Sequence, residues 1–264
     1  MTINSVNVSV RPFKLCADNA EKTDDGRVIP DENTLGHKNG SGKNRRLPGM
    51  NEDLDRIWKR KVISIVRGLP VNYMLDLAQA LCAGGIDLME ITFSQAEPKT
   101  WKDTAAAIKA VNEYMQGNML VGAGTVITNE QVDLAYKAGA KYIITPNVNP
   151  VFIRRVKQYG MLAFPGALTP SEIEEAFEAG ADAVKVFPAG QLGPAYIKAV
   201  RAPLSHIPLM AVGGVNEKNA ADFVAAGCCG VGVGGNLVNK QWIMAGEWDK
   251  ISDLAAEYRR AVDL

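Results

Sequence analysis

Short apolar runs alternate with longer amphipathic segments along the chain from residue 51 onward. Apolar runs of this length, bounded by glycine, proline or polar residues, are typical of strands buried in a parallel sheet. The predicted strands are 62–66, 88–92, 119–121, 142–144, 162–164, 183–187, 209–212 and 230–233. The predicted helices are 52–59, 73–83, 101–114, 129–138, 151–159, 170–179, 194–200, 217–226 and 248–261.

Residues that favour helix caps stand at the ends of these helices. Thr128 precedes one helix with Gln131 three residues later, and Thr169 precedes another with Glu172 in the same position. Four helices end in an Ala-Gly pair, in which glycine can supply the left-handed C-terminal cap. These glycines are Gly84, Gly139, Gly180 and Gly227.

Eight strand–helix units favour an α/β fold, a compact (β/α)8 or TIM barrel preceded by a short N-terminal helix. A doubly wound open sheet is the alternative, but it usually has fewer strands and a glycine fingerprint after the first one. Here the first strand is followed by Arg67-Gly68-Leu69-Pro70, which lacks that fingerprint. We therefore predict a barrel domain over residues 50–264, with its active site at the C-terminal ends of the strands.

Residues 1–49 have a different composition. They are rich in Asp, Asn, Gly, Lys and Arg and show no helix or strand period from Pro12 on. We predict a disordered extension, with a binding tail as the less favoured alternative. Because Met50 directly precedes the patterned part, a further hypothesis is that translation begins there and that 1–49 is mis-assigned. The intact mass of the protein from its native source distinguishes these possibilities.

The charge balance argues against two classes of partner. The chain has 29 basic and 29 acidic residues, so no net charge attracts nucleic acid or an anionic membrane. No apolar run is long enough to span a membrane, and no secretory signal is visible at the N-terminus. We expect a cytoplasmic protein. The four cysteines lack a CxxC spacing and are expected to be reduced thiols. With only two histidines, a metal site is not expected.

Two charged residues stand in the middle of predicted strands. Lys185 lies within Ala183-Val184-Lys185-Val186-Phe187, and Glu90 lies within the strand 88–92. A lysine among apolar neighbours is costly to keep charged, so its pKa should fall and leave a nucleophilic amine. A carboxylate nearby could transfer protons. A lysine that reaches water at a strand end, or a structural ion pair between the two residues, explains the same positions.

Glycine pairs follow the last two strands. Gly213 and Gly214 come after the seventh strand, and Gly234 and Gly235 come after the eighth. Barrels commonly bind phosphate at this place through exposed backbone N–H groups. The alternative is that these glycines only make tight turns.

Six motifs in this order resemble the class I 2-keto-3-deoxy-6-phosphogluconate (KDPG) and 4-hydroxy-2-oxoglutarate (KHG) aldolase family, over about residues 55–262. They are Met89-Glu90-Ile91-Thr92, Val121-Gly122-Ala123-Gly124-Thr125-Val126, Thr145-Pro146-Asn147, Pro165-Gly166-Ala167, Val184-Lys185-Val186-Phe187-Pro188-Ala189 and Ala211-Val212-Gly213-Gly214-Val215. The resemblance implies a small (β/α)8 barrel, a homotrimer, a keto acid substrate and no metal or other cofactor.

The resemblance also implies roles for individual residues. Lys185 would form a Schiff base with pyruvate, and Glu90 would be the general acid and base, acting through a water molecule. Arg67 would bind the substrate carboxylate. The remaining residues divide between the pyruvate pocket and the phosphate end of the substrate. The pocket would be lined by Thr125, Pro146 and Phe187, and the phosphate would be bound by Gly213, Gly214 and Gly235.

Three positions depart from the pattern of many family members. Ser94 stands where many have an arginine, Val212 where many have a threonine, and Gly235 where the family has a phosphate-binding serine. The motifs Thr145-Pro146-Asn147 and Gly193-Pro194-Ala195-Tyr196-Ile197-Lys198-Ala199 look closer to the 2-keto-3-deoxy-6-phosphogalactonate branch. The C4 stereochemistry and the need for a phosphate therefore stay open.

We predict a lyase that cleaves KDPG to pyruvate and D-glyceraldehyde 3-phosphate, or 4-hydroxy-2-oxoglutarate to pyruvate and glyoxylate. The phosphogalactonate reaction is one alternative. A phosphate-binding barrel isomerase or epimerase, with Glu90 as base, is a second and predicts no covalent adduct with pyruvate. A barrel that binds small molecules without turnover is a third, in which Glu90 and Lys185 only stabilise the fold.

Overall fold

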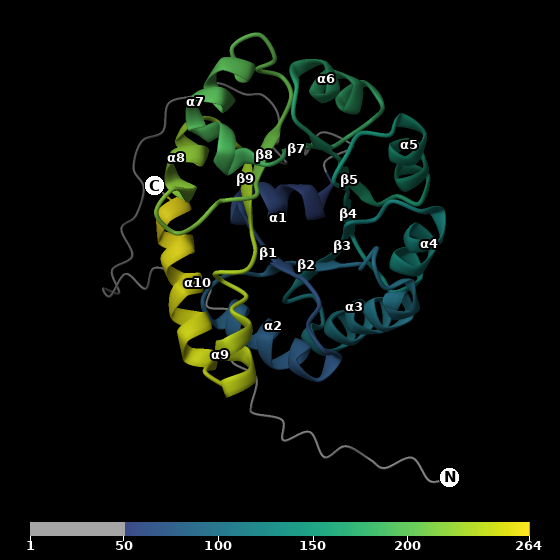
Figure 1. Ribbon diagram of the computed structural model, residues 1–264, viewed down its shortest axis with the longest axis vertical. Helices are drawn as coiled ribbons and strands as arrows, with labels where there is room; N and C mark the ends of the chain where they lie inside the picture. Colours follow the sequence, from purple (N-terminus) through teal and green to yellow (C-terminus); the bar gives the residue numbers. More distant parts are fainter. Residues whose placement is uncertain (1–50, 264) are drawn as a thin grey trace, which may run out of the picture.

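Parallel strands surround a common axis in the computed structural model, which describes residues 51–263 (Figure 1). Nine strands lie in the order β5-β4-β3-β2-β1-β9-β8-β7-β6. Their bounds are β1 (Val62–Val66), β2 (Leu88–Thr92), β3 (Leu120–Gly124), β4 (Tyr142–Ile144), β5 (Leu162–Phe164), β6 (Gly166–Ala167), β7 (Val184–Val186), β8 (Leu209–Val212) and β9 (Gly230–Val233). Six of the eight predicted strands have these same bounds, and the predicted barrel is confirmed.

The barrel closes through β5, which is the fifth predicted strand, and β6, a two-residue strand that the sequence pattern did not predict. Pro165 separates them, and a proline has no N–H for the ladder. The closure continues across this break, because Asp182 N donates to Ala163 O over 3.0 Å and Lys185 N donates to Pro165 O over 2.8 Å. These hydrogen bonds, together with the pairing of β6 with β7, close the barrel despite the interruption.

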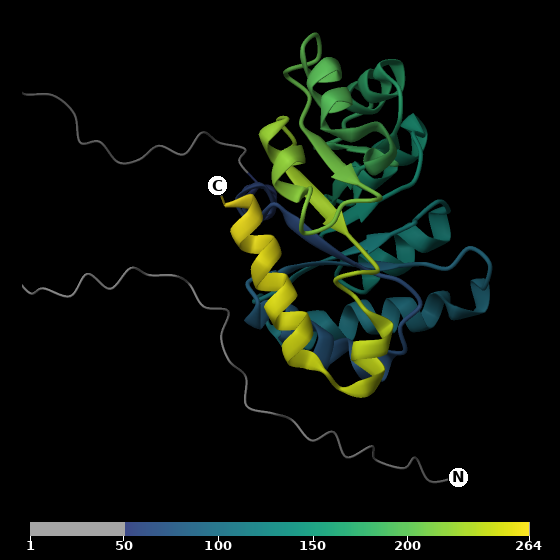
Figure 2. The same cartoon turned by 60° about the vertical axis from the view of Figure 1, so that its left-hand side comes forward.

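The described helices other than α1 form a ring outside the strands (Figures 1 and 2). The bounds of the described helices are α1 (Glu52–Arg60), α2 (Met74–Ala83), α3 (Trp101–Met115), α4 (Asn129–Lys137), α5 (Pro150–Gln158), α6 (Pro170–Glu178), α7 (Ala189–Arg201), α8 (Ala220–Ala225), α9 (Lys240–Ala245) and α10 (Trp248–Val262), with short 3-10 turns η1 (Val71–Tyr73) and η2 (Pro98–Thr100). The sequence pattern did not predict α9. It also missed the first turn of α7, which a non-helical Gly193 (φ 74°) separates from the predicted part.

The helix caps agree with the sequence prediction except at the C-terminal end of α2. Thr128 with Gln131 and Thr169 with Glu172 form the two reciprocal capping boxes that their spacing indicates. Gly139, Gly180 and Gly227 have positive φ, as a left-handed cap requires. After α2, however, the left-handed residue is Gly85 and not Gly84. An Ala-Gly-Gly sequence offers two sites for the cap, and the sequence alone does not choose between them.

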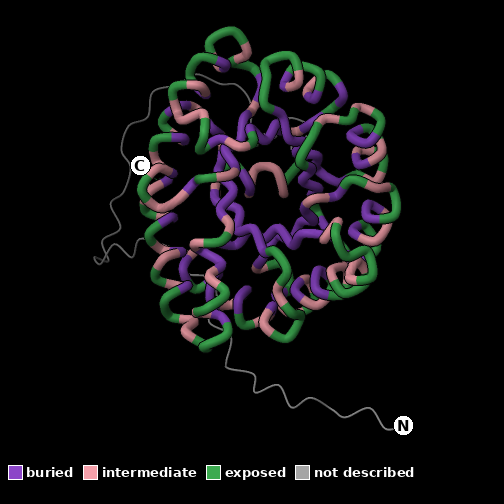
Figure 3. Tube along the Cα trace, viewed as in Figure 1, coloured by how far each residue is buried: buried purple, intermediate pink, exposed green. Residues whose placement is uncertain are grey.

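Two apolar cores result from the alternation of side chains along the strands. One lies between strands and helices, and Figure 3 shows the buried positions on the strands and on the inner sides of the helices. The other lies inside the barrel and includes Ile57 of α1, a helix that Figure 1 shows across the centre of the ring of strands. Asp87, 2% exposed, holds this helix by accepting hydrogen bonds from Arg56 and Arg60. The short helix therefore seals the end opposite the expected active site.

The prediction for residues 1–49 lies outside the described residues. Within 51–263, no helix has the length and apolar character that crossing a membrane requires. Cys228 and Cys229 are free thiols.

Candidate active site

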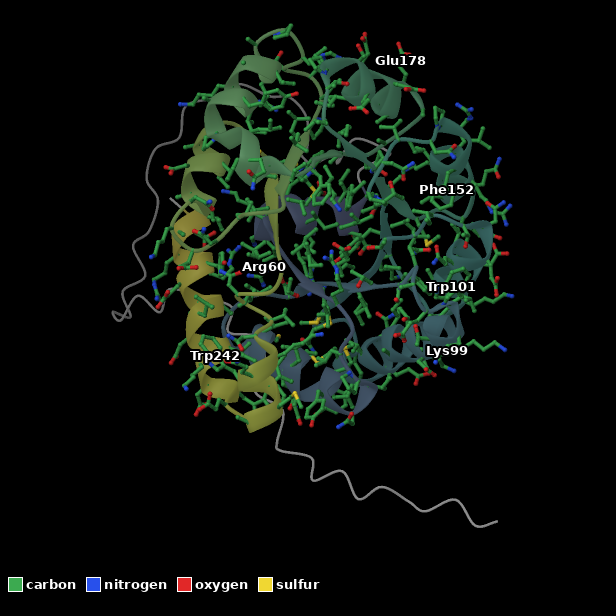
Figure 4. The ribbon with its side chains drawn as sticks, in the orientation of Figure 1. Arg60, Lys99, Trp101, Phe152, Glu178 and Trp242 are labelled. Carbon is green, nitrogen blue, oxygen red and sulfur yellow. The ribbon has the colours of Figure 1, made fainter. Side chains whose placement is uncertain are left out.

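Two buried charged residues face each other inside the barrel. Glu90 comes from β2 and Lys185 from β7, and their side chains are 1% and 7% exposed. Leu88 of β2 and Ala183, which directly precedes β7, stand two residues before Glu90 and Lys185 and belong to the interior core, so Glu90 and Lys185 also point inward. Figure 4 shows side chains filling the space inside the ring of strands. The side chains of Lys185 and Glu90 therefore both lie inside the barrel, as their positions on the strands indicate.

Two glycines on β3 leave room for the groups that cross the barrel. An ideal Cβ on Gly124 would stand 1.6 Å from Glu90 Oε1, and one on Gly122 would stand 2.1 Å from Cε2 of Tyr142. Both glycines are in strand conformation and face inward, so the restriction is steric. The Glu90 carboxyl lies over Gly124 because no side chain occupies that place.

Lys185 lies beneath an aromatic ring at the mouth of the barrel. Its Nζ is 4.9 Å from the centroid of the Phe187 ring. That ring, 40% exposed, packs against Gly213, where an ideal Cβ would come within 2.9 Å of Phe187 Cε2. The Phe187 ring therefore lies between the Lys185 amine and the turn at Gly213.

Burial dominates the electrostatics of the pair. It raises the pKa of Glu90, and the charges of Lys185 and Arg67 offset part of that rise. It lowers the pKa of Lys185, with the Glu90 charge opposing and the Arg67 charge adding to the change. Both changes favour the neutral forms, a free amine and a carboxylic acid. Glu90 Oε2 is buried without a hydrogen-bond partner, and no ion pair joins Glu90 to Lys185 in the described chain. The structural ion pair does not fit this geometry.

The other predicted residues lie around the mouth. Arg67 follows β1, is exposed, and is close enough for its charge to act on both Glu90 and Lys185. Thr125 and Pro146 follow β3 and β4 on the other side of Glu90. The sheet order puts β1 between β2 and β9, so Arg67 lies nearer to the loop with Gly235 than to Thr125.

The glycines after β8 and β9 differ in kind. Gly213 and Gly214 have φ values of 87° and 77°, and Gly190 N donates to Gly213 O over 2.7 Å. These two glycines meet the needs of a tight turn that packs against the start of α7. An ideal Cβ on Gly234 or Gly235 would meet nothing within 4 Å, and neither glycine has positive φ. The loop after β9 is therefore open, and no steric reason requires glycine there.

The family model for KDPG and KHG aldolases matches residues 54–254. This chain belongs to that family. A 2-dehydro-3-deoxy-6-phosphogalactonate aldolase of Escherichia coli (strain K12) is 38% identical over 208 residues, which cover 78% of this chain and 98% of that protein. A 2-dehydro-3-deoxy-phosphogluconate aldolase of Treponema pallidum (strain Nichols) is 34% identical over 210 residues, covering 78% and 94%.

A solved structure agrees in fold. The crystal structure of the KDPG aldolase from Legionella pneumophila, with pyruvate captured at low pH as a covalent carbinolamine intermediate, superimposes with a TM-score of 0.69. The two chains are 26% identical, and the match covers 77% of this chain and 96% of that one. As a member of the KDPG and KHG aldolase family, this chain is an aldolase and hence a lyase.

The three departures from the family pattern have different surroundings in this aldolase. Ser94 accepts a hydrogen bond at its carbonyl from Trp101 Nε1 over 2.7 Å, so its backbone is fixed. Val212, 5% exposed, packs over Gly232, where an ideal Cβ would come within 2.9 Å of Val212 Cγ2. Its apolar side chain donates no hydrogen bond to a substrate hydroxyl. Gly235 lies in the open loop.

Sequence reasoning missed two groups near the site of this aldolase. Tyr142 fills the barrel beneath Glu90 and is fully buried. Gln95 and Gln131 form a hydrogen-bonded connection to Thr125. The sequence spacing identifies Gln131 only as the capping partner of Thr128. Gln95 carries no sequence signal because it becomes a neighbour of Gln131 only in the folded barrel.

Proposed function

We propose that this protein is a class I aldolase in which Lys185 forms an imine with a 2-keto-3-deoxy-6-phospho sugar acid. Cleavage gives pyruvate and D-glyceraldehyde 3-phosphate, and 4-hydroxy-2-oxoglutarate would give pyruvate and glyoxylate. The observation that carries the proposal is a buried lysine with a lowered pKa that shares the barrel interior with a buried carboxyl of raised pKa. Such an amine is a nucleophile near neutral pH.

The protonation states suit the order of steps. The neutral amine of Lys185 attacks the C2 carbonyl to give a carbinolamine. Protonated Glu90, through a water molecule, gives its proton to the leaving hydroxyl, and water departs to leave the iminium ion. Glu90 is then a carboxylate and can accept the C4 hydroxyl proton. The C3–C4 electron pair moves into the iminium ion, which forms an enamine and releases the aldehyde.

The cycle closes with the same two residues. Glu90 returns its proton to C3 of the enamine, which regenerates an iminium ion, now of pyruvate. Addition of water and loss of the amine free pyruvate and restore Lys185. The Glu90 carboxyl alternates between acid and base, and a raised pKa places it closer to the range in which both forms are accessible.

The mouth of the barrel supplies groups for both ends of the substrate. Arg67 and Thr125 are proposed to bind the carboxylate, and Pro146 and Phe187 to line the pyruvate pocket. The phosphate would lie against the N–H groups of the loops after β8 and β9, where Gly213, Gly214 and Gly235 stand. The position of these loops at the C-terminal ends of adjacent strands supports this assignment.

The gluconate and galactonate series differ at C4, next to the bond that breaks. Val212 is the departure that bears on this choice, because a valine cannot bind the C4 hydroxyl as a threonine would. The phosphogalactonate reaction is therefore kept as the alternative within the same mechanism. Rates with both stereoisomers, measured at several concentrations, would assign the series.

A cytoplasmic homotrimer is also proposed. Three exposed apolar residues support a surface for further copies: Ile127, Val151 and Leu168 are 46%, 73% and 41% exposed. Ile127 and Leu168 lie in the loops after β3 and β6, and Val151 lies in the first turn of α5, which follows β4. Analytical ultracentrifugation of the protein and of Val151→Asp tests this proposal, with dissociation of a trimer as the expected result.

Borohydride trapping tests the mechanism. The protein is incubated with pyruvate, reduced with sodium borohydride and digested for mass spectrometry. A pyruvate-derived adduct on the peptide with Lys185, and none on the peptide with the exposed Lys240, is the expected result. An unmodified Lys185 in folded protein with excess pyruvate would exclude the imine and favour the isomerase or the barrel without turnover.

A further inference from the structure

We propose that Gln95 is a positioning residue that holds Thr125, and with it the wall of the pocket beside Glu90, in the geometry that binds the keto acid. This inference rests on the proposed function. It concerns how strongly the pocket binds pyruvate, not whether Lys185 can form an imine.

Thr125 has an unfavourable backbone. Its φ is 54°, in the left-handed region that glycine and asparagine occupy far more readily than a β-branched residue. Strained residues of this kind persist where their surroundings determine the conformation, and they are concentrated at functional sites. Thr125 directly follows Gly124, whose Cα lies against the Glu90 carboxyl. A change in the Thr125 backbone would therefore move the wall beside Glu90.

Backbone hydrogen bonds fix the chain on both sides of Thr125 but not Thr125 itself. Before it, Phe93 N donates to Gly124 O over 2.9 Å. After it, Val126 N reaches Ile144 O at 3.4 Å. The carbonyl of Thr125 accepts a hydrogen bond from a side chain instead, Gln95 Nε2, over 2.6 Å. Gln95 thus supplies the contact that the strand ladder does not.

Gln95 is in turn oriented by a buried amide. Gln131 is 0% exposed, and its Oε1 accepts hydrogen bonds from Ile127 N at 2.8 Å and Thr128 N at 3.1 Å. Its Nε2 must then face away from these donors, and it donates to Gln95 Oε1 over 3.1 Å. This leaves Gln95 Nε2 directed at the Thr125 carbonyl.

Each amide in this relay has one allowed orientation, because backbone N–H groups fix the first and every later group needs a complementary partner. The relay connects the rigid start of α4 to the strained residue at the pocket. A side chain at position 95 that accepts a hydrogen bond but cannot donate one would break the link to Thr125 and keep the link to Gln131.

The chain offers a matched pair of variants. Gln95→Met keeps the length of the side chain and removes both hydrogen bonds. Gln95→Glu keeps an acceptor for Gln131, but an ionised carboxylate places a negative oxygen against the Thr125 carbonyl, whereas a protonated one can donate to it. The control is Gln79→Met, which removes a similar amide hydrogen bond, to Tyr114 Oη at 2.5 Å, on the remote surface between α2 and α3.

The measurement is the pyruvate concentration that gives half-maximal borohydride adduct at Lys185. Gln95→Met should raise it about tenfold, the effect of one hydrogen bond, while the maximal adduct stays near the wild-type amount. Gln79→Met should leave it unchanged. At neutral pH, the half-saturating pyruvate concentration of Gln95→Glu should be equal to or higher than that of Gln95→Met. The half-saturating pyruvate concentration of Gln95→Glu, divided by that of Gln95→Met, should fall as acidification protonates the carboxyl that the substitution Gln95→Glu introduces.

The two proposals fail in different ways. If wild-type protein forms no adduct, the proposed function is wrong. If wild-type protein forms it and Gln95→Met shows unchanged half-saturation, or only a lower melting temperature, Gln95 is structural and this inference is wrong. A ratio between the Glu and Met variants that does not change with pH would also overturn it.

Discussion

The two halves of the barrel interior have opposite chemistry. The apolar part, called the lower half here because it packs with Ile57 of α1, consists of Ile57, Ile63, Leu88, Leu120, Tyr142, Ile144, Leu162, Phe164, Ala183 and Met210. The upper half contains Glu90 and Lys185 with no ion pair between them in the described part of the chain. Burial is the first cause of both pKa changes, so the apolar lower half helps to make the upper half reactive. Mutations in the lower half should therefore mainly change stability, and mutations in the upper half should mainly change activity.

The largest effect is expected from Lys185→Met, which keeps the apolar stem and removes the amine. Imine formation should be lost, and the aldolase rate should fall by at least about 10⁴-fold. Retro-aldol assays with a sensitive pyruvate readout would measure this, with Lys240→Met as the control for loss of a lysine outside the barrel interior. Residual activity near the wild-type level would show that another group is the nucleophile.

The same variant should be more stable at neutral pH. Because burial lowers the pKa of Lys185, the unfolded chain holds more protons than the folded one between that lowered pKa and the ordinary lysine value. Wild-type stability therefore rises with pH across this window, whereas the Met variant lacks that rise. Urea unfolding at neutral pH and near pH 10 should show the advantage of Lys185→Met shrinking as pH increases. An advantage that is constant with pH would argue against the lowered pKa.

Glu90→Gln should retain the shape of the upper half and lose its proton carrier. The rate of cleavage is expected to fall by about 10²–10⁴-fold, while pyruvate still forms some trapped adduct at Lys185 after long incubation. Since burial raises the pKa of Glu90, the wild-type kcat profile should contain an ionisation above the ordinary glutamate range. The Gln variant should lack that ionisation. Unchanged kcat, or the same pH profile in both proteins, would remove Glu90 from the mechanism.

The variants Gly122→Ala and Gly124→Ala add the same methyl group next to Tyr142 of the lower half and next to Glu90 of the upper half. At Gly122 it would stand 2.1 Å from the ring of Tyr142, which is fully buried and cannot move freely. Unfolding free energy should fall by about 1–3 kcal/mol. At Gly124 it would stand 1.6 Å from Glu90 Oε1, at the end of a flexible side chain, so kcat should fall about 10- to 100-fold.

Urea unfolding and kcat measured on both alanine variants separate these effects. Gly122→Ala should lose more stability, and Gly124→Ala should lose more activity. If both variants change the two quantities in the same proportion, the interior does not divide into a packing half and a catalytic half.

Much of this arrangement is visible in the sequence because of strand periodicity. Apolar runs identify the strands, and side-chain alternation puts Glu90 and Lys185 on inward faces. The sequence does not reveal that Gly122 and Gly124 make space across the barrel, since tight turns also favour glycine. It does not reveal that Gln95 meets Gln131, because their contact depends on how the loop after β2 packs against α4. Local pattern predicts elements, whereas these contacts follow from tertiary packing.

The smallest effect is expected at the phosphate end, from Gly235→Ser. A Cβ there would meet no atom within 4 Å and the backbone is not left-handed, so stability should change by no more than about 0.5 kcal/mol. The hydroxyl would add a donor for a phosphate and should lower the KM of a phosphorylated substrate about 3- to 10-fold. The substrate 4-hydroxy-2-oxoglutarate has no phosphate, so its KM should not change.

Gly234→Ser is the matched control for this variant, since its Cβ also meets no atom within 4 Å. Steady-state assays with both substrates on both variants measure the effect. A decrease in KM that is specific to position 235 and to the phosphorylated substrate would place the phosphate at the loop after β9. An equal change for both substrates would mean that the phosphate does not bind at the loop after β9.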